Sequence, residues 1–381
     1  MSASHGIPLS LYIHIPWCIK KCPYCDFNSH AVRDELPEAA YVDALLADLE
    51  QELSQSHGRA IQSIFIGGGT PSLFSVESIT RLLDGVAKRA TLTSDVEVTM
   101  EANPGTFEKD KFTGFKTAGI NRLSIGVQSF NNQHLTALGR VHNQNEAIAA
   151  AEFARKTFNR LNLDLMHGLP GQSLQDAIAD LQQAIDLKPD HLSWYQLTIE
   201  PNTEFYSKPP QLPVDDTLWD IQSEGQALIA AAGYEQYEVS AYAQPNSQAR
   251  HNLNYWTFGD YIGIGAGAHG KLTLANGDII RRAKQRQPKG YLNLDSRIAS
   301  ESTLSIEELP FEFMMNALRL TDGVTSQTFS DRTGRPFSEL APKVAEAQRK
   351  GLLIDSNEYL KPTPQGQLFL NDLLALFLED E

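Results

Sequence analysis

The chain has 381 residues, 41% of them hydrophobic, which is enough to form a barrel-sized domain and a smaller second one. Its formal net charge of −15 repels phosphate backbones, so nucleic acid is not expected as a general partner. No run approaches the ~20 consecutive apolar residues of a membrane-spanning helix, so no integral membrane segment is expected.

In chain order, short runs rich in β-branched and aromatic residues alternate with longer helical patterns. The runs predict six strands, at residues 9–15, 61–66, 96–101, 122–128, 161–166 and 191–199. Apolar residues at helical spacing predict helices around 38–55, 76–89, 107–118, 144–157, 174–186 and 216–231. Strands joined by helical crossovers pair in parallel. We therefore expect an α/β fold, a partial (β/α)6 TIM-like barrel, with a doubly wound open sheet as the alternative.

The pattern changes from about residue 300. Helical patterns around 306–320, 325–332 and 338–350 lead to a predicted hairpin at 352–361 and a last apolar helix from Gln365 to Leu378. Helices followed by a hairpin are typical of a winged-helix-like module. The acidic residues 379–381 argue against DNA binding, so a cap over the barrel mouth is expected. An apolar stripe predicts the core of this module: Leu368, Phe369, Leu373, Leu376 and Phe377.

These patterns divide the chain into three parts. A barrel domain is expected at 1–235, a connecting region at 236–300 and a smaller, mainly helical domain at 301–381.

The cysteines form the most informative motif. The chain has three, and Cys18, Cys22 and Cys25 follow the spacing C-x3-C-x2-C. A [4Fe-4S] cluster usually takes four thiolates, so three leave one iron open to a non-protein ligand. Disulfides are disfavoured by the odd count and by the absence of a secretory signal, but tetrahedral zinc with His14 or His30 is an alternative. Cluster thiolates survive poorly in oxidising compartments, so a cytoplasmic location is expected.

Residues at the ends of the predicted strands outline a pocket. Three glycines at 67–69 follow the second strand, where they let the backbone approach a ligand, although a ligand-free turn is the alternative. Glu101, Gln128 and Asp164 end three further strands, and each needs a partner if it is buried. Three such residues from separate strands predict one shared lining. Arg140 adds a possible carboxylate-binding fork, with a solvated arginine as the alternative.

Together these motifs resemble the radical S-adenosylmethionine (SAM) superfamily, and within it the oxygen-independent coproporphyrinogen III oxidase branch that includes HemW-like haem chaperones. The resemblance rests on residues 11–18, 22–27, 67–71, 125–130 and 164–170. It implies that SAM chelates the open iron of a [4Fe-4S] cluster, and that an electron from the cluster can release a 5′-deoxyadenosyl radical.

The resemblance also implies roles for individual residues. Cys18, Cys22 and Cys25 would bind the cluster. The remaining residues would contact SAM or a second SAM-sized site beside it, and whether two molecules bind stays open. They are Tyr12, Tyr24, Gly68, Gly69, Thr70, Glu101, Gln128, Arg140 and Asp164.

A second motif, at residues 251–256, resembles the HNxxYW sequence associated with haem binding in HemW-like proteins. It implies haem contacts from His251, Asn252, Tyr255 and Trp256. Imidazole is a common axial ligand of haem iron, and Tyr and Trp suit the flat face of a macrocycle. From the residues alone, a hydrogen-bonded core histidine is the alternative.

Two features follow this motif. Residues 261–270 are rich in glycine and predict either a backbone wall of the site or a close-packed turn. A basic group predicts a solvated loop, with contacts to haem propionates as the alternative. It consists of Arg281, Arg282, Lys284, Arg286 and Lys289.

One departure from the branch separates two functions. The decarboxylating oxidases typically carry a further cysteine where this chain has Phe27, which puts coproporphyrinogen III decarboxylation in doubt. The expected function is therefore a haem chaperone that delivers haem to apo-haemoproteins, with those of the respiratory chain as candidates, and that uses an electron donor. The alternative is an oxygen-independent coproporphyrinogen III oxidase.

Overall fold

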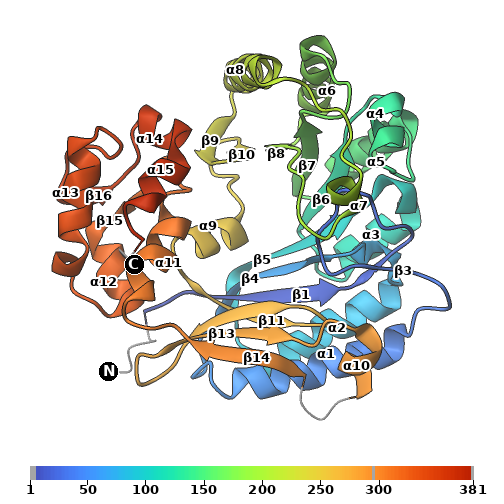
Figure 1. The fold of residues 1–381 in the computed structure, drawn as a ribbon. Helices are drawn as coiled ribbons and strands as arrows, with labels where there is room; N and C mark the ends of the chain where they lie inside the picture. Colours follow the sequence, from blue (N-terminus) through green and yellow to red (C-terminus); the bar gives the residue numbers. More distant parts are fainter. Residues whose placement is uncertain (1–5, 294–296, 379–381) are drawn as a thin grey trace.

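The computed structural model describes residues 6–293 and 297–378. Its main feature is a curved, mixed sheet with helices on its convex side (Figure 1). Within the described residues the strand order has two separate ends, so the sheet is open. The order is β14 (Ile298–Thr303), β13 (Ile279–Lys284), β12 (His269–Thr273), β11 (Asp260–Ile264), β1 (Leu9–Ile15), β4 (Ile61–Gly68), β5 (Leu92–Ala102), β6 (Arg122–Gln128), β7 (Arg160–His167), β8 (His191–Gln196), β10 (Ala241–Ala243) and β9 (Glu235–Glu238).

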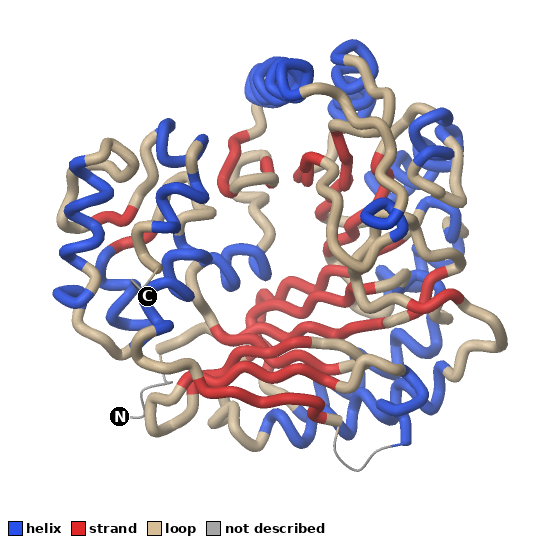
Figure 2. The backbone as a smooth tube through the Cα atoms, in the orientation of Figure 1, coloured by secondary structure: helices blue, strands red, loops and turns tan. Residues whose placement is uncertain are grey.

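The predicted partial barrel is confirmed. Strands β1 and β4 to β8 correspond to the six predicted strands and form consecutive parallel pairs. Figure 2 shows the alternation of strand and helix along this part of the chain. The predicted helices are also present, as α1 (Glu38–Leu53), α2 (Val76–Arg89), α3 (Lys109–Thr117), α5 (Gln144–Thr157), α6 (Leu174–Asp186) and α8 (Asp215–Ala231).

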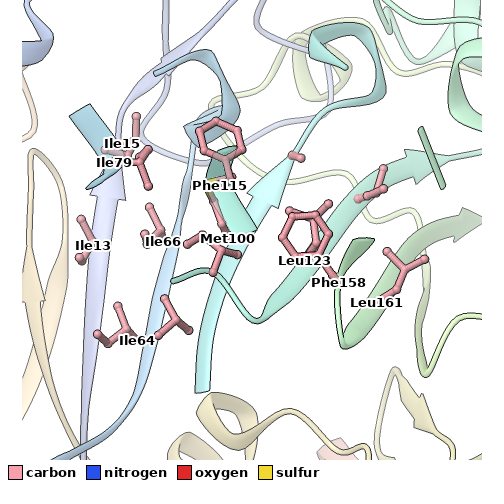
Figure 3. Close-up of a cluster of buried hydrophobic side chains, with 14 of the residues drawn as sticks. Ile13, Ile15, Ile64, Ile66, Ile79, Met100, Phe115, Leu123, Phe158 and Leu161 are labelled. Carbon is pink, nitrogen blue, oxygen red and sulfur yellow. The ribbon is translucent and has the colours of Figure 1, made fainter. Parts of the chain in front are cut away.

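The core lies between the parallel strands and these helices. Ile13, Ile66 and Leu123 are fully buried on the strands, and Phe115 from α3 packs among them (Figure 3). Burial of each large side chain stabilises the fold by about 1.5–3 kcal/mol. This packing fixes the strand ends, and with them the residues that follow each strand.

The sequence did not indicate a seventh parallel strand. Strand β11 pairs in parallel with β1, and β12, β13 and β14 extend the sheet in antiparallel fashion. The prediction of a wall or turn at 261–270 missed this, because glycine at 263 and 265 hides the apolar alternation of a strand. Gly263 is needed there, since an added Cβ would lie 1.9 Å from the His269 carbonyl oxygen.

The prediction of a solvated basic loop was wrong for Arg282 and Lys284. Both are buried on β13 and pair with carboxylates of α1. Lys284 Nζ donates to Asp48 Oδ1 and to Glu52 Oε1, each at 2.6 Å, and Arg282 Nη1 donates to Glu52 Oε2 at 2.9 Å. Tyr291 donates to the other Asp48 oxygen at 2.6 Å. This ionic network joins β13 to α1.

The C-terminal part contains the predicted helices α11 (Glu308–Ala317), α12 (Ser326–Thr333) and α13 (Ala341–Arg349). The predicted hairpin is only partly formed: Leu353 bridges Pro362, and the two-residue strands β15 (Val324–Thr325) and β16 (Tyr359–Leu360) pair with each other. Buried residues of these helices form one hydrophobic cluster with Tyr237 of β9 and Ala241 of β10. Figure 1 shows these helices grouped together, in orange and red.

The prediction of one continuous helix at the end of the chain was wrong. The helix is broken at Phe369 into α14 (Pro364–Leu368) and α15 (Leu370–Ala375), because Phe369 adopts φ −107° and ψ 47°. The break leaves Leu368 and Phe369 exposed by 56% and 47%, so they are not core, whereas Leu373 and Phe377 are buried as predicted. Residues 379–381 lie outside the described residues.

Among the helices that the structure describes, none combines the length and apolar character that a membrane crossing requires. The division of the chain at residues 235 and 300 stays a prediction.

Candidate functional site

The cysteine loop begins at the carboxyl end of β1. Cys18 ends the short strand β2 (Trp17–Cys18), which pairs in parallel with β3 (His30–Ala31) and closes the loop between them. Within the loop, the Cys25 amide donates to the Cys22 carbonyl oxygen at 3.1 Å. All three thiols are free and half-buried. The loop thus presents three soft donors from one compact turn.

The three cysteines line one cavity of about 330 Å³. It lies where strands β4 to β7 end, as expected for a sheet whose parallel strands all present their carboxyl ends to the same side. The structure brings eight of the nine residues predicted for SAM into this lining, and only Tyr12 lies elsewhere. The eight are Tyr24, Gly68, Gly69, Thr70, Glu101, Gln128, Arg140 and Asp164.

The glycines pack the end of β4 against the cysteine loop. The Gly69 amide donates to the Ile15 carbonyl at 2.7 Å, and the Thr70 amide donates to the Trp17 carbonyl at 2.7 Å. A Cβ on Gly69 would lie 2.5 Å from that Trp17 oxygen, and Gly68 has a φ of +112° that other residues rarely adopt. The turn therefore depends on glycine and leaves backbone exposed to the cavity.

Two acidic residues face this cavity from β5 and β7. Glu101 accepts a hydrogen bond from the Gly68 amide at 3.0 Å, and burial together with the nearby Asp164 raises the pKa of Glu101 to about 8. Asp164 accepts from Ser124 Oγ at 2.8 Å and from Asn162 Nδ2 at 2.7 Å, and burial raises its pKa. A cationic group entering the cavity would favour the ionised form of Glu101.

Arg140 and Gln128 form the other side of the cavity. Arg140 Nη2 donates to the Gly126 carbonyl at 2.6 Å, and its Nη1 lies 3.6 Å from the Cys22 sulfur. Gln128 has a φ of 70°, a strained backbone conformation of the kind that clusters at functional sites. Its Oε1 accepts from Tyr195 at 3.0 Å.

The sequence did not indicate Ser193 and Tyr195, which also line this cavity from β8. Alternation along the strand at 191–196 places both on one face, and that signal could have found them.

A second, larger cavity of about 580 Å³ adjoins the first and shares Phe27, Gly68 and Glu101 with it. Tyr12 lines this second cavity, as do Tyr255 and Trp256 of the predicted haem motif. The rest of its lining includes basic and aromatic residues of β11, β12 and β13. These include Tyr261, His269, Lys271 and Arg281, and Arg286 lines the cavity from the segment just after β13.

The first two residues of the haem motif lie outside both linings. On α9 (Arg250–Trp256), the His251 ring stacks on Phe65 with centroids 4.3 Å apart, and its Nδ1 lies 3.7 Å from Glu97 Oε1. Burial lowers the pKa of His251. Asn252 Nδ2 donates to the Tyr237 hydroxyl at 3.0 Å.

The donor set fits an iron–sulfur cluster better than the zinc alternative. Neither His14 nor His30 lines the cysteine cavity. His14 Nδ1 is bonded to the Tyr12 hydroxyl at 2.7 Å and its Nε2 to the Asn28 carbonyl at 2.8 Å, while His30 Nε2 lies 3.3 Å from the Arg286 carbonyl. Three thiols therefore share the cavity with glycine backbone and carboxylates rather than with a fourth imidazole.

Matches to two family models define the class of protein. Residues 12–184 match the family model described as the radical SAM superfamily, and residues 304–369 match the HemN C-terminal domain. Among solved structures, the fold resembles coproporphyrinogen III oxidase (HemN) from Escherichia coli, described as a radical SAM enzyme, with a TM-score of 0.83 at 23% identity. That match covers 98% of this chain and 92% of HemN. Radical SAM proteins use SAM and a [4Fe-4S] cluster.

The relatives then define the family. The chain is 54% identical over 374 residues to the haem chaperone HemW of Escherichia coli K12, covering 98% of this chain and 99% of that protein. It is 51% identical over 379 residues to HemW of Haemophilus influenzae, with the same coverage. The chain belongs to the HemW family.

Proposed function

We propose that this protein is a haem chaperone that binds haem next to a [4Fe-4S] cluster with SAM and passes the haem to apo-haemoproteins. The observation that carries the proposal is the pair of adjoining cavities, which share Phe27, Gly68 and Glu101. One is lined by thiols, glycine backbone and carboxylates, and the other by aromatic rings and cations. The names of the full-length relatives support the same function.

The smaller cavity is the proposed cofactor site. Cys18, Cys22 and Cys25 would hold the cluster, leaving one iron for SAM, and together the two would supply one-electron chemistry when reduced. Glu101 and the Gly68 backbone would hold the amino group of SAM, because a buried carboxylate is stabilised by an incoming cation. The other predicted SAM contacts are part of this proposal.

The larger cavity is the proposed haem site. Tyr255 and Trp256 offer ring surface to a macrocycle, and the cations Arg281 and Arg286 suit its propionate groups. Phe27, 59% exposed, stands where the oxidases typically carry a further cysteine, which favours transport of haem over decarboxylation.

The recipients in this proposal are apo-haemoproteins, with respiratory ones as candidates, and a cytoplasmic location and an electron donor belong to it. The predicted contacts of His251 and Asn252 with haem also stay predictions.

The decisive experiment is anaerobic incubation of the reconstituted protein with SAM, a reductant and either haem or coproporphyrinogen III, followed by product analysis. We expect stoichiometric haem binding, transfer of haem to an apo-haemoprotein, and no vinyl products. Rapid conversion of coproporphyrinogen III would instead identify the protein as an oxidase. Failure to bind haem at micromolar concentrations would refute the chaperone function.

A further inference from the structure

Two histidines line the larger cavity, and they differ in whether their ring nitrogens are hydrogen bonded. Both ring nitrogens of His14 are hydrogen bonded, to Tyr12 and to the Asn28 carbonyl. His269 is exposed at the start of β12, and within residues 6–293 and 297–378 its ring nitrogens have no hydrogen-bond partner. Of the two histidines in this lining, His269 is therefore the one whose ring nitrogens are available to a ligand.

Strand pairing leaves room beside His269. It is directly opposite Ala283 on β13, so the neighbouring side chain on the same face is a methyl group. Gly263 on β11 lets the backbone of His269 approach that strand closely. Two positions further along β12, Lys271 is opposite Arg281, which places cations on the same face as the imidazole. The imidazole therefore projects beside a small side chain, with Lys271 and Arg281 further along the same face.

The cations in this lining are not equally available to a ligand. Lys271 Nζ is paired with Asp260 at 2.8 Å, and Arg281 is paired with Glu312. Arg286 is exposed, and within the part of the chain that the structure describes its guanidinium has no acidic partner. A ligand carboxylate would therefore find its best partner at this arginine.

The Trp256 indole supplies a further unused donor. Its Nε1 is buried and has no hydrogen-bond partner in the described residues, although the ring lines the cavity. An unpartnered buried donor costs about 1–3 kcal/mol, and because Nε1 has almost no exposed surface, an acceptor on a bound ligand would relieve that cost only after the indole moves. Asp26 and Glu101 also face this cavity, so a ligand carboxylate is expected at the arginine side rather than near them.

His251 is placed differently. Its ring stacks on Phe65, and Phe65, not His251, forms the cavity surface at that point. Its Nδ1 faces Glu97, which also accepts from the Arg250 amide at 2.8 Å. Direct contact between His251 and a ligand in the larger cavity would require Phe65 to move.

We propose that His269 is the axial ligand to haem iron in the larger cavity, that Arg286 pairs with a haem propionate, and that His251 is a positioning residue behind Phe65. The inference rests on the proposed function, because it names the axial ligand of the same haem and the residues that hold it. It assigns coordination of the iron to a residue outside the HNxxYW motif. The aromatic residues of that motif, Tyr255 and Trp256, would then contact the face of the macrocycle.

The test compares histidine variants of the reconstituted full chain during titration with ferric haem, followed by the Soret absorption band. His269→Ala should shift this band and weaken haem affinity about tenfold or more, and added imidazole should restore the wild-type band. His269→Met should shift the band by exchanging nitrogen for sulfur. His251→Ala should keep the band position, and His57→Asn, at an exposed site with a φ of 55°, should change neither band nor affinity.

The outcomes separate this inference from the proposed function. If wild-type protein binds haem and His269→Ala keeps both band and affinity, the assignment is overturned while the chaperone function stands. Loss of the band in His251→Ala alone would assign the iron to His251 instead. If wild-type protein does not bind haem, the proposed function itself fails. Because His269 is exposed, its variants should retain the wild-type circular dichroism, which shows that they are folded.

Discussion

The two adjoining cavities come from different parts of the chain and differ in how their polar groups are used. The cysteine cavity is formed by the loops that follow parallel strands, whereas the larger cavity has a wall of antiparallel strands β12 and β13 together with α9. Several polar groups of the first are already satisfied, as in the bonds of Glu101 to Gly68 and of Asp164 to Ser124. In the second, and within the described residues, the Arg286 guanidinium has no acidic partner, and the His269 ring nitrogens and Trp256 Nε1 have no hydrogen-bond partner, although the Arg319 guanidinium lies 4.3 Å from the centroid of the Trp256 ring.

This difference indicates that the two cavities bind different kinds of ligand. A cavity with satisfied groups and glycine-dependent turns holds its shape before any ligand arrives, which suits permanent cofactors. A cavity with an exposed histidine and an exposed arginine that lack side-chain partners in the described residues suits a ligand that enters and leaves. If the two cavities hold different ligands in this way, a change in one should leave binding in the other intact.

The largest effect is expected in the cysteine cavity. Cys22→Ser should abolish the broad visible absorption of the anaerobically reconstituted cluster, because two thiolates are too few to hold it. Ferric haem binding should be retained, since Cys22 does not line the larger cavity. The matched control is Ser29→Ala, which removes a hydroxyl 3.9 Å from the Cys25 sulfur and should leave the absorption unchanged. Simultaneous loss of cluster and haem would contradict independent cavities.

The second effect concerns the support of the larger cavity. Lys284→Met leaves the carboxylates of Asp48 and Glu52 without their buried cation, so the free energy of unfolding should fall by about 3–5 kcal/mol. Because β13 also carries Arg281, haem affinity should fall with it. Urea denaturation measures the first effect and haem titration the second. Lys289→Met, at an exposed position of α10 (Pro288–Asn293), should change stability by less than about 0.5 kcal/mol.

The third effect lies at Glu101, which both cavities share. Its pKa is raised from 4.5 to about 8 by burial and by Asp164, so the folded chain binds a proton there that the unfolded chain releases. Stability should therefore decrease as pH rises from about 4.5 to 8, by at most about 1.4 kcal/mol per pH unit. Glu101→Gln should lose less stability between pH 5 and pH 8 than the wild type, as measured by urea denaturation at both pH values. The exposed Glu358→Gln should follow the wild type, and equal slopes for all three proteins would refute the prediction.

The cysteine cavity could be predicted from the sequence because its residues follow strands with clear apolar patterns. Gly68 and Gln128 are the last residues of β4 and β6, Glu101 is the second-last residue of β5, and Asp164 lies in the carboxyl-terminal half of β7. Parallel pairing brings these parts of the strands together without further information. The cysteines are close in sequence and need no fold to be recognised as one donor set.

The larger cavity could not be predicted in the same way. His269 and Arg286 lie on or next to antiparallel strands whose pairing depends on β11, and β11 contains a glycine that obscures its pattern. Burial of Lys284 depends on carboxylates of α1, more than 200 positions earlier in the chain, and composition alone favours a solvated loop. The positions of His269 and Arg286 and the burial of Lys284 thus depend on contacts between distant segments rather than on local propensity.

The smallest effect is expected at Arg286. Arg286→Gln removes a charge from the larger cavity but leaves its rings in place, so haem affinity should fall only several-fold, about 1 kcal/mol for an exposed ion pair. The loss should depend on the propionates: haem dimethyl ester should bind wild type and variant equally. Arg349→Gln, an exposed arginine of α13 in the C-terminal part, should leave haem affinity unchanged. Equal losses for haem and its ester would mean that Arg286 shapes the cavity rather than pairs with a carboxylate. The cluster absorption should be normal in every case, because Arg286 does not line the cysteine cavity.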